Sequence, residues 1–503
     1  MKKFKNILFA AAVALAASCS MDYRPVGNLD DETAILSLAD AEKAADYLLV
    51  RLRGLYSGSY IYSSELSTDL FHPTLSYGNR GGGMYRWEFQ SQTGEMEDLW
   101  AHAYFTIANA NYLIEKIGDL DRDELSEAEN ARLEQILGEA AFIKAVNVYA
   151  LTEKFCKPYN ESTAASDLGV MIVDEYAPTS DQSKYPGRSS LKDTYSYIDE
   201  QLSIAAAKVT APGTLAAENI TADVVTAFKA RVALAKGDYP TAAAAASSLV
   251  DGGRYPLIDA SSETAEEDWE GLWHYDSGEE CVMQLYASFA DQSVPSTLTY
   301  GYYGLNTTGI YSPDYIPESH IIDQYTDSDI RTNWFDAVTI TVSSINGAVI
   351  LLNKFPGNPA LQSPTQATSS YLHKVKPFRI AEQYLIAAEA YARMGGADDK
   401  AAQYLSAFAT MRDPRFEVRG DLLTLIRNER LKEFIGEGFR FYDLKRYGQG
   451  FSRNEAQNTN VTNSNGADMS IAADDYRWLW PIPQAEIDAN PQIKDQQNPG
   501  YTK

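Results

Sequence analysis

Cysteine is scarce in this chain: its 503 residues include three cysteines, Cys19, Cys156 and Cys281. Three cysteines cannot form the disulfide framework that holds small secreted domains together. Cys156 and Cys281 could pair with each other, but two free, buried thiols are the simpler interpretation. We therefore expect no disulfide scaffold.

Histidine is also scarce, and no histidine stands at a metal-ligand spacing from another. The five histidines are His72, His102, His274, His320 and His373. The sequence also lacks the G-x-S-x-G, H-E-x-x-H, C-x-x-C, Walker and G-x-G-x-x-G motifs. The stretch "RGGGMYR" at residues 80–86 lacks the Lys-Ser/Thr pair of a phosphate-binding loop. These absences predict no catalytic residue, no metal and no cofactor.

The chain has far fewer basic than acidic residues. The 43 Lys and Arg residues oppose 69 Asp and Glu residues, which gives a formal net charge of −26 at pH 7. A chain this acidic repels the phosphates of nucleic acids and anionic lipid head groups. The composition therefore excludes a broad nucleic-acid-binding face, and it suits a soluble body held off an anionic outer surface.

No apolar run reaches the roughly 20 residues that span a bilayer. A shorter run, Ile7–Ala17, follows a basic start and ends at small residues and Cys19. This pattern is typical of a secretory signal, and a cysteine at the junction is typical of a bacterial lipoprotein, whose thiol and new amino terminus are acylated. The alternative is a plainly secreted protein with a coincidental cysteine.

The chain therefore divides into a lipoprotein signal peptide at residues 1–18, a lipidated tether at 19–35 and a folded body at 36–503. Cys19 is the predicted lipidation site, and we expect this anchor to be the sole membrane contact. Asp22, which closely follows the cysteine, is consistent with display on the outer face.

Helical periodicity begins directly after the tether. The stretch "LADAEKAADYLLVRLRGLY" places apolar residues at a 3.6-residue period, and residues 99–118 and 131–155 repeat the pattern. Residues 221–255 and 378–414 each contain an Ala-rich helix, a glycine turn and a second Ala-rich helix, which is close to the tetratricopeptide unit. Such units stack on their neighbours. The pattern predicts a mostly α-helical protein with tetratricopeptide-like helix pairs.

Two regions differ from this pattern. A loop-rich region spans about residues 60–95, and a longer one, rich in Gly, Ser, Thr, Pro and Tyr, spans 256–376. The longer region contains short strand-like runs such as "ECVMQLYAS" and "AVTITVSS". Loops of this length in a compact protein are usually functional, so we expect the ligand site here.

One stretch carries a candidate catalytic arrangement of carboxylates. In "RNERLKEFIGEGFRFYDLKRYG", Glu429, Glu433 and Glu437 follow at four-residue spacing, and glycoside hydrolysis uses paired carboxylates. Interleaved Arg and Lys residues can satisfy these charges, and Gly436 and Gly438 can break the helix between the second and third glutamates. We therefore expect a structural ion-pair cluster and no catalysis.

The same stretch resembles the Glu-Arg…Glu-(x)3-Glu-Gly-x-Arg-(x)2-Asp-Leu-x-Arg segment of the SusD/RagB family of Bacteroidetes surface lipoproteins. "RIAEQYLIAAEAYARMG" at 379–395 resembles a helix of that family, and "WPIPQAEIDANPQIKDQQNPGY" at 480–501 resembles its C-terminal ending. The lipoprotein signal is a fourth agreement. Because order and spacing hold, the resemblance covers essentially the whole chain.

The resemblance implies a mostly α-helical, SusD-like fold with a loop-rich ligand-binding region that contains short strands. It also implies a nutrient-binding protein of the outer membrane that captures an oligosaccharide for a SusC/RagA-like TonB-dependent barrel, without covalent chemistry. In the RagB branch the ligand is an oligopeptide, and "DLGVMIVDEY", "RYPLI" and "EFIGEG" look somewhat closer to that branch. Both ligand classes therefore stay open.

The candidate ligand contacts are aromatic and polar residues of the two loop-rich regions, because sugar rings stack on aromatic side chains while amides and guanidiniums bind sugar hydroxyls. The first region supplies Tyr77, Asn79, Arg80, Tyr85 and Trp87, and the second supplies Tyr300, Tyr302, Tyr303 and Tyr311. The alternative for each aromatic residue is that it covers a small core of the loop region. The tyrosine-rich loops favour a glycan, whereas the branch resemblance favours a peptide.

Two other classes of function compete with ligand capture. A surface glycoside hydrolase needs two carboxylates in one cleft, about 5 to 9.5 Å apart. A structural or adhesive surface protein would affect attachment and leave growth on a single nutrient unchanged.

Overall fold

The computed structural model describes residues 34–288, 290, 301–306, 308–362 and 371–501. The predicted signal peptide, Cys19 and most of the predicted tether lie outside the described residues. None of the described helices combines the length and the apolar character that a bilayer crossing requires.

The described chain is mostly α-helical, as predicted. The longer helices are α2 (Leu38–Ser57), α5 (Gly94–Asp119), α6 (Glu127–Phe155), α7 (Leu191–Lys208), α8 (Ala222–Lys236), α9 (Tyr239–Asp251), α10 (Ala265–His274), α13 (Ile380–Met394), α14 (Asp398–Arg412) and α15 (Leu422–Glu433). The shorter helices are α3 (Ser59–Leu66), α4 (Gly82–Tyr85), α12 (Ser319–Ile322), α16 (Arg440–Tyr447) and α17 (Gln484–Ala489). The strands are β1 (Phe71–Pro73), β2 (Cys281–Met283), β3 (Tyr315–Pro317), β4 (Phe335–Val342), β5 (Ile345–Leu352), β6 (Phe378–Arg379), β7 (Phe451–Ser452) and β8 (Ser470–Ile471).

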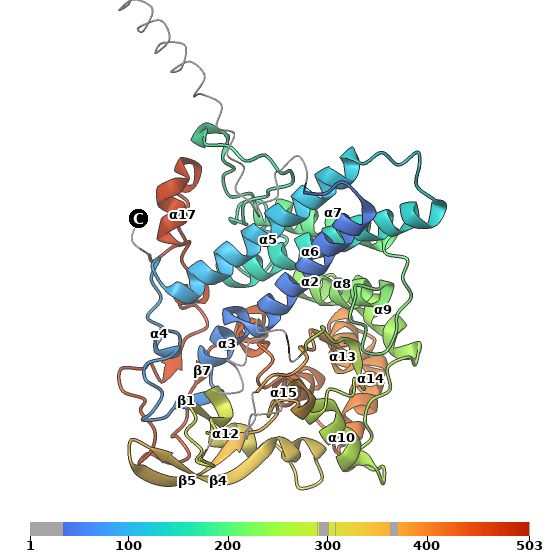
Figure 1. Ribbon diagram of the computed structural model, residues 1–503. Coiled ribbons are helices and arrows are strands. Elements are labelled where there is room, and N and C mark those ends of the chain that lie inside the picture. Colours follow the sequence, from blue (N-terminus) through green and yellow to red (C-terminus); the bar gives the residue numbers. More distant parts are fainter. Residues whose placement is uncertain (1–33, 289, 291–300, 307, 363–370, 502–503) are drawn as a thin grey trace, which may run out of the picture.

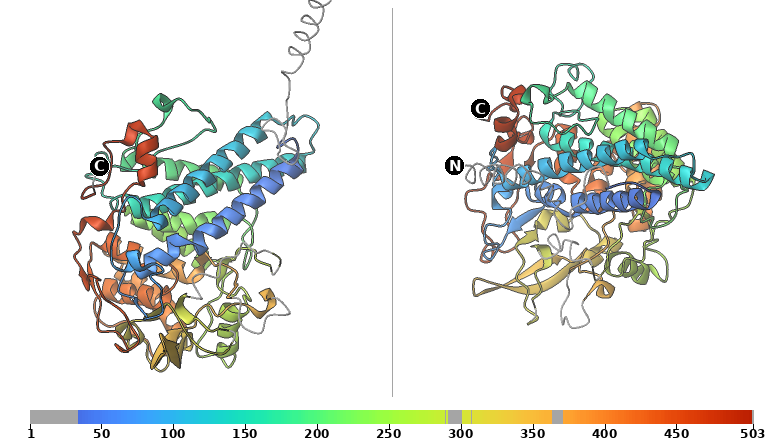
Figure 2. Two further views of the ribbon diagram at one scale, coloured as in Figure 1. Left: turned by 60° about the vertical axis from the view of Figure 1, so that its left-hand side comes forward. Right: turned by 45° about the horizontal axis from the view of Figure 1, so that its top comes forward.

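The long helices α2, α5, α6 and α7 form one side of the molecule, and the β4–β5 hairpin lies on the opposite side (Figures 1 and 2). α6 is the central helix, because α2, α5, α7 and α8 all pack against it. It begins with a capping box in which Ser126 and Glu129 each satisfy a backbone N–H of the other. Nearly every residue in its C-terminal half is buried, as expected for a helix surrounded on all sides.

The two Ala-rich segments form the helix pairs α8–α9 and α13–α14. The hydroxyl of Thr221 caps α8, which ends at Gly237 in the left-handed conformation. Asp238 then caps α9. Helices α9 and α13 pack closely, so the two pairs stack on each other in the tetratricopeptide manner.

The strands form four two-stranded antiparallel sheets. All of them except β6 belong to residues 60–95, 256–376 and 451–471, which we call the loop-rich side. β1 pairs with β3, with His72 opposite Ile316, so the two predicted loop-rich regions lie together. They are less irregular than predicted, because α3 and α4 lie in the first and α10 in the second. These helices show too few turns to produce a clear period in the sequence.

The C-terminal segment returns to the end of α6. The backbone N–H of Trp480 donates to the Lys154 carbonyl (2.9 Å), and the Asn498 amide donates to the Phe155 carbonyl (2.8 Å). Arg188, which precedes α7, donates to the Asn498 side chain (2.9 Å). The last described residues therefore complete the environment of the central helix.

Both described cysteines are free and buried, as predicted. Burial raises the pKa of the Cys156 thiol and raises that of Cys281 to about 12. Because the thiolate is the reactive form, these neutral thiols act as small apolar side chains of the core.

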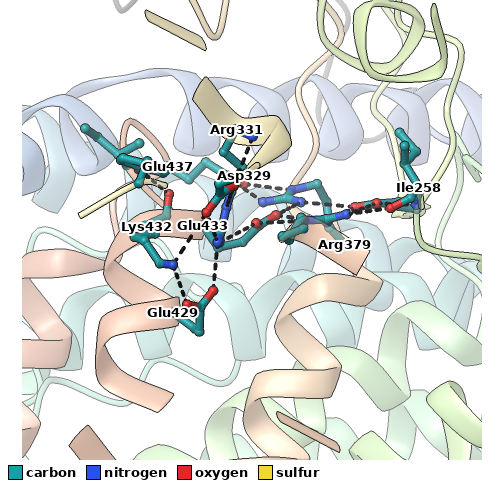
Figure 3. Close-up of polar contacts among 12 residues, drawn as sticks. Ile258, Asp329, Arg331, Arg379, Glu429, Lys432, Glu433 and Glu437 are labelled. Carbon is teal, nitrogen blue, oxygen red and sulfur yellow. Dashed lines mark hydrogen bonds and ion pairs between the residues drawn. The ribbon is translucent and has the colours of Figure 1, made fainter. Parts of the chain in front are cut away.

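A buried ionic centre joins the loop-rich side to the helix pairs (Figure 3). It contains five acidic and five basic side chains: Glu280, Asp329, Glu429, Glu433 and Glu437, with Arg331, Lys354, Arg379, Arg412 and Lys432. Glu433 lies in the middle and accepts from Arg379 (2.7 Å) and Arg412 (3.1 Å). Arg331, from the 3₁₀ turn Ile330–Trp334, adds a third contact to Glu433 (3.4 Å). One carboxylate at the end of α15 thus holds groups from β6, α14 and the loop-rich side.

The other acids of the ionic centre are paired as well. Arg412 donates to both oxygens of Glu280 (2.7 and 2.6 Å), and Lys354 donates to Glu437 (2.6 Å). Burial opposes the charge on Glu433, but the surrounding guanidiniums outweigh it and lower its pKa. The predicted structural ion-pair cluster is confirmed, and these carboxylates are not free for acid–base chemistry.

The turn after α15 explains the two glycines of this stretch. Gly436 and Gly438 have φ values of 81° and 86°, in the left-handed region that glycine adopts without strain. Their N–H groups donate to the two oxygens of Glu65, at 2.9 and 2.6 Å. Burial raises the pKa of Glu65 to about 7, against the effect of these two N–H groups. The predicted helix break before Glu437 is confirmed.

The ionic centre predicts a large loss of stability when its central charge is removed. Glu433→Gln should lower the free energy of unfolding by about 3–5 kcal/mol, because three buried guanidiniums lose their shared counter-charge. Denaturant unfolding followed by circular dichroism measures this change. In the control Glu417→Gln, an ion pair between exposed side chains is removed, and the loss should stay below about 1 kcal/mol. Equal losses in the two variants would contradict a central role for Glu433.

Candidate functional site

Four segments of the loop-rich side converge around the end of β1. The backbone N–H of Thr74 donates to the Asp314 carbonyl (2.8 Å), and the backbone N–H of Leu75 donates to the Val461 carbonyl (2.9 Å). The N–H of Ser343, in the β4–β5 turn, donates to the Ser76 hydroxyl at 3.0 Å. We call the surface formed by residues 74–88, 311–315, 341–346 and 458–466 the loop surface.

Residues 77–81 of the loop surface fold into a tight turn, which we call the arch, and this turn projects polar side chains. Gly78, Asn79 and Gly81 all have left-handed φ values, of 58°, 62° and 65°. A side chain at Gly81 would come within 2.4 Å of Leu66, so the arch sits directly on α3. Asn79 tolerates this conformation better than most residues. The arch leaves Asn79 and Arg80 exposed to solvent.

Arg86 organises the polar groups beneath the arch. Its Nη1 donates to the Tyr77 hydroxyl (3.1 Å) and to the Asn79 side-chain oxygen (2.9 Å). Its Nε and Nη2 donate to the two oxygens of Glu88, at 2.9 and 2.8 Å. The hydrogen bonds from Arg86 lower the pKa of Glu88, so this pair stays charged near neutral pH.

Arg80 forms the second ion pair of the loop surface. Its Nε donates to Asp314 (2.6 Å), and its backbone carbonyl accepts from the Tyr315 hydroxyl (2.6 Å). Burial raises the pKa of Asp314, and Arg80 opposes that effect. The Arg80 side chain remains 55% exposed while that of Asp314 is 4% exposed. Arg80 can therefore meet a ligand while the buried carboxylate fixes its position.

Two partly exposed rings complete the loop surface. Tyr77 packs edge-on against buried Tyr315, with ring centroids 6.0 Å apart. Tyr311 packs edge-on against Tyr303 at 5.2 Å, and its carbonyl accepts from Thr341 next to the hairpin turn. The loop surface thus offers aromatic faces, an amide and two guanidiniums that already have carboxylate partners. Such a set suits stacking and hydrogen bonding to an uncharged polar ligand.

The structure separates the predicted contact residues into two groups. Tyr77, Asn79, Arg80 and Tyr311 lie on the loop surface. Tyr300 lies outside the described residues.

The prediction is wrong for three of the other aromatic residues, which are core residues. Tyr85 is 1% exposed and lies under the Arg453 guanidinium, 3.9 Å from the ring centroid. Trp87 is 2% exposed and donates its Nε1–H to the Ser67 carbonyl (2.9 Å). Tyr302 is 1% exposed and stacks on Phe71 at 4.3 Å. Rings this enclosed cannot contact a ligand.

Tyr303 is the fourth predicted contact residue that lies in the core. It is 9% exposed, and its hydroxyl donates to Asp336 (2.7 Å). It belongs to a separate core of the loop-rich side, together with Ile316, Ile340 and Val461. The physical reason for all four errors is that the loop-rich side has enough apolar side chains to bury its own core.

Two residues of the loop surface, Glu88 and Asp314, were missed as site residues. Glu88 pairs with Arg86 across one residue of the sequence, which is a weak signal in a loop. Asp314 pairs with Arg80 across 234 positions, so no local pattern could reveal it. Asp314 holds the predicted contact residue Arg80 in place, and Glu88 holds Arg86.

The carboxylate arrangement of the described chain gives no support to the hydrolase class. Glu429, Glu433 and Glu437 are bound in the ionic centre, away from the loop surface. Within the described ranges, no group of three or more His, Cys, Asp or Glu side chains is placed to hold a metal ion.

Comparison with known proteins places two family models on the chain. The model of the SusD family matches residues 291–501, and a model described as starch-binding and associating with the outer membrane matches residues 31–234. A search of the curated proteins gave no significant match.

Solved structures share the fold over nearly the full chain. A SusD superfamily protein from Bacteroides vulgatus has a TM-score of 0.77 at 22% identity, over 93% of this chain and 100% of that one. A SusD superfamily protein from Bacteroides thetaiotaomicron has a TM-score of 0.76 at 25% identity, over 92% and 100% of the two chains. A SusD-like carbohydrate binding protein from Bacteroides vulgatus has a TM-score of 0.76 at 19% identity, over 93% and 100%.

The division between core and surface aromatic residues can be measured. Trp87→Ala should lower the free energy of unfolding by about 3–5 kcal/mol, because it removes a large buried ring. Tyr77→Ala, at a partly exposed ring of the same loop, should cost less than half as much. Thermal and denaturant unfolding of both variants provide the comparison. A larger loss for Tyr77→Ala than for Trp87→Ala would reverse the assignment.

Proposed function

Because the chain belongs to the SusD family, we propose that it is a glycan-binding lipoprotein of the bacterial cell surface. It captures an oligosaccharide on the loop surface and passes it to a SusC/RagA-like TonB-dependent transporter in the outer membrane. It performs no covalent chemistry on the ligand. The match to a model described as starch-binding and associating with the outer membrane supports the ligand class and the location.

The observation that carries the proposal is the composition of the loop surface. Tyr77 and Tyr311 are partly exposed rings, Asn79 is an exposed amide whose oxygen accepts from the Tyr77 hydroxyl (3.3 Å), and Arg80 is an exposed guanidinium. A sugar ring needs both kinds of group, since its C–H face is apolar and its rim carries hydroxyls. Because Arg80 and Arg86 each have a carboxylate partner, the surface favours an uncharged glycan over an acidic one.

An oligopeptide ligand is the second candidate, and the sequence segments nearer to the RagB branch favour it. In the structure these segments are scaffold. Residues 167–176 include Gly169, whose carbonyl accepts from buried Arg188 (2.7 Å). Residues 254–258 and 433–438 border the ionic centre. The branch resemblance therefore concerns parts of the fold away from the loop surface, and we place the glycan first.

Attachment to the membrane is proposed through Cys19, with the protein exposed on the outer face. The family resemblance and the apolar run before the cysteine support this anchor. The partner transporter is inferred from the same family resemblance.

Ligand class can be tested by isothermal titration calorimetry of the mature chain against neutral oligosaccharides and oligopeptides. We expect an oligosaccharide to bind, and Tyr77→Ala to weaken it about tenfold through the loss of one stacking face. Tyr47→Ala, which removes an exposed ring from α2, is the matched control and should leave the affinity unchanged. Binding of peptides alone would overturn the glycan proposal and support the RagB-type alternative.

Lipid anchoring can be tested with Cys19→Ser. This variant should leave the membrane fraction and lose incorporation of labelled fatty acid, because the acylated thiol is absent. Its affinity for the ligand should equal that of the native protein, since the loop surface is unaltered. A variant that still partitions with membranes in cells lacking the partner transporter would contradict the anchor.

A further inference from the structure

A cavity of about 80 Å³ lies inside the molecule, between α3, α6, α8, α16 and the segment 373–377. A cavity needs roughly 10–15 Å³ to admit a water molecule, so this one is large enough to be hydrated. Tyr56 and Lys374, which are partly exposed, are among its lining residues. None of the loop-surface residues lines it, so this interior cavity is a separate site.

One wall of the interior cavity contains the Glu153 carboxyl group together with tyrosine hydroxyls. Glu153 accepts hydrogen bonds from the hydroxyls of Tyr60 and Tyr149. Among the described residues it forms no ion pair: nearby Lys154 donates to the Ser64 hydroxyl, and Lys445 donates to the Glu153 backbone carbonyl. A buried carboxyl that is hydrogen-bonded to phenols, and not directly to a cation, keeps acceptor capacity for a ligand hydroxyl.

The other charges around the interior cavity are already balanced. Arg231 pairs with Glu382 through two bonds of 2.7 Å, and Lys376 pairs with Asp276 at 2.6 Å. Arg446 pairs with Glu389 at 2.6 and 2.7 Å. A charged ligand would therefore be buried without an opposite protein charge to pair with it, and the loss of its hydration would cost much free energy.

The aromatic walls also disfavour a cationic ligand. The Arg231 guanidinium lies over the Phe439 ring at 5.2 Å, and Lys154 lies over the Tyr60 ring at 5.4 Å. Because protein cations already occupy these ring faces, a ligand cation would be repelled. An uncharged molecule is the remaining choice, and the ring edges of Tyr149 and Tyr442 provide apolar contact for its C–H groups.

We propose that the interior cavity binds one small, uncharged polyhydroxy molecule, a polyol or a monosaccharide. Its hydroxyls donate to Glu153 and accept from the Arg231 guanidinium, while its carbon chain lies against Tyr442. Since none of its lining residues belongs to the loop surface, the cavity is a second site, separate from glycan capture.

The test is calorimetric titration of the full mature chain with glycerol, erythritol and xylose. We expect saturable one-to-one binding of at least one of the three compounds. Glu153→Gln should weaken that binding about tenfold, because an acceptor oxygen becomes a donor amide. Ala235→Leu, which fills the cavity and removes no polar group, should abolish it.

Thermal unfolding of each variant identifies any that fail to fold, and Ala235→Leu keeps the test decisive if Glu153→Gln is unstable. Tyr77→Ala should leave polyol binding unchanged even where it weakens an oligosaccharide, so the two proposals fail separately. Absence of binding by all three polyols would overturn the cavity proposal. Unchanged binding in Ala235→Leu, or loss of polyol binding in Tyr77→Ala, would also overturn it.

Discussion

The contact between Glu433 and three arginines is the constraint on which the arrangement of the molecule depends. A buried carboxylate is tolerated only where cations surround it, and each of those cations needs the carboxylate in turn. Arg331 belongs to the 3₁₀ turn Ile330–Trp334, whereas Arg379 and Arg412 belong to β6 and α14. Their shared bonds to Glu433 therefore join segments that are far apart in the sequence. Each of these arginines also pairs with a second carboxylate, so a displacement would disturb several buried ion pairs at once.

That fixed junction has a consequence for the loop surface. In the part of the chain that the structure describes, the strands of the loop-rich side form only two-stranded sheets, which are marginally stable alone. Its stability comes from being attached to the helices and from a layer of buried rings, including Tyr85, Trp87, Tyr302 and Tyr315. These rings support Tyr77 and the arch that carries Asn79. A surface held in this way loses little conformational freedom when it binds a ligand.

The fold was predictable wherever a local pattern was repeated over several turns. The helices α2, α5 and α6, the two Ala-rich pairs and the break after Glu433 follow from periodicity, capping residues and glycines. The candidate site was predictable only to the level of its two loop regions. A tyrosine in a Gly-rich loop has the same local sequence whether its ring is in the core, as for Tyr302, or at the surface, as for Tyr77. Long-range pairs decide between them, and the Arg80–Asp314 pair leaves no local trace.

The return of the C-terminal segment to α6 determines when the fold can be completed. The hydrogen bond from Asn498 to the Phe155 carbonyl joins residues 343 positions apart. Contacts this distant in sequence form late, because a long loop must close before they stabilise anything. Until Trp480 and Asn498 have been synthesised, the carbonyls at the end of the central helix lack their native partners. The native environment at the end of α6 is therefore complete only once the segment 480–498 is in place.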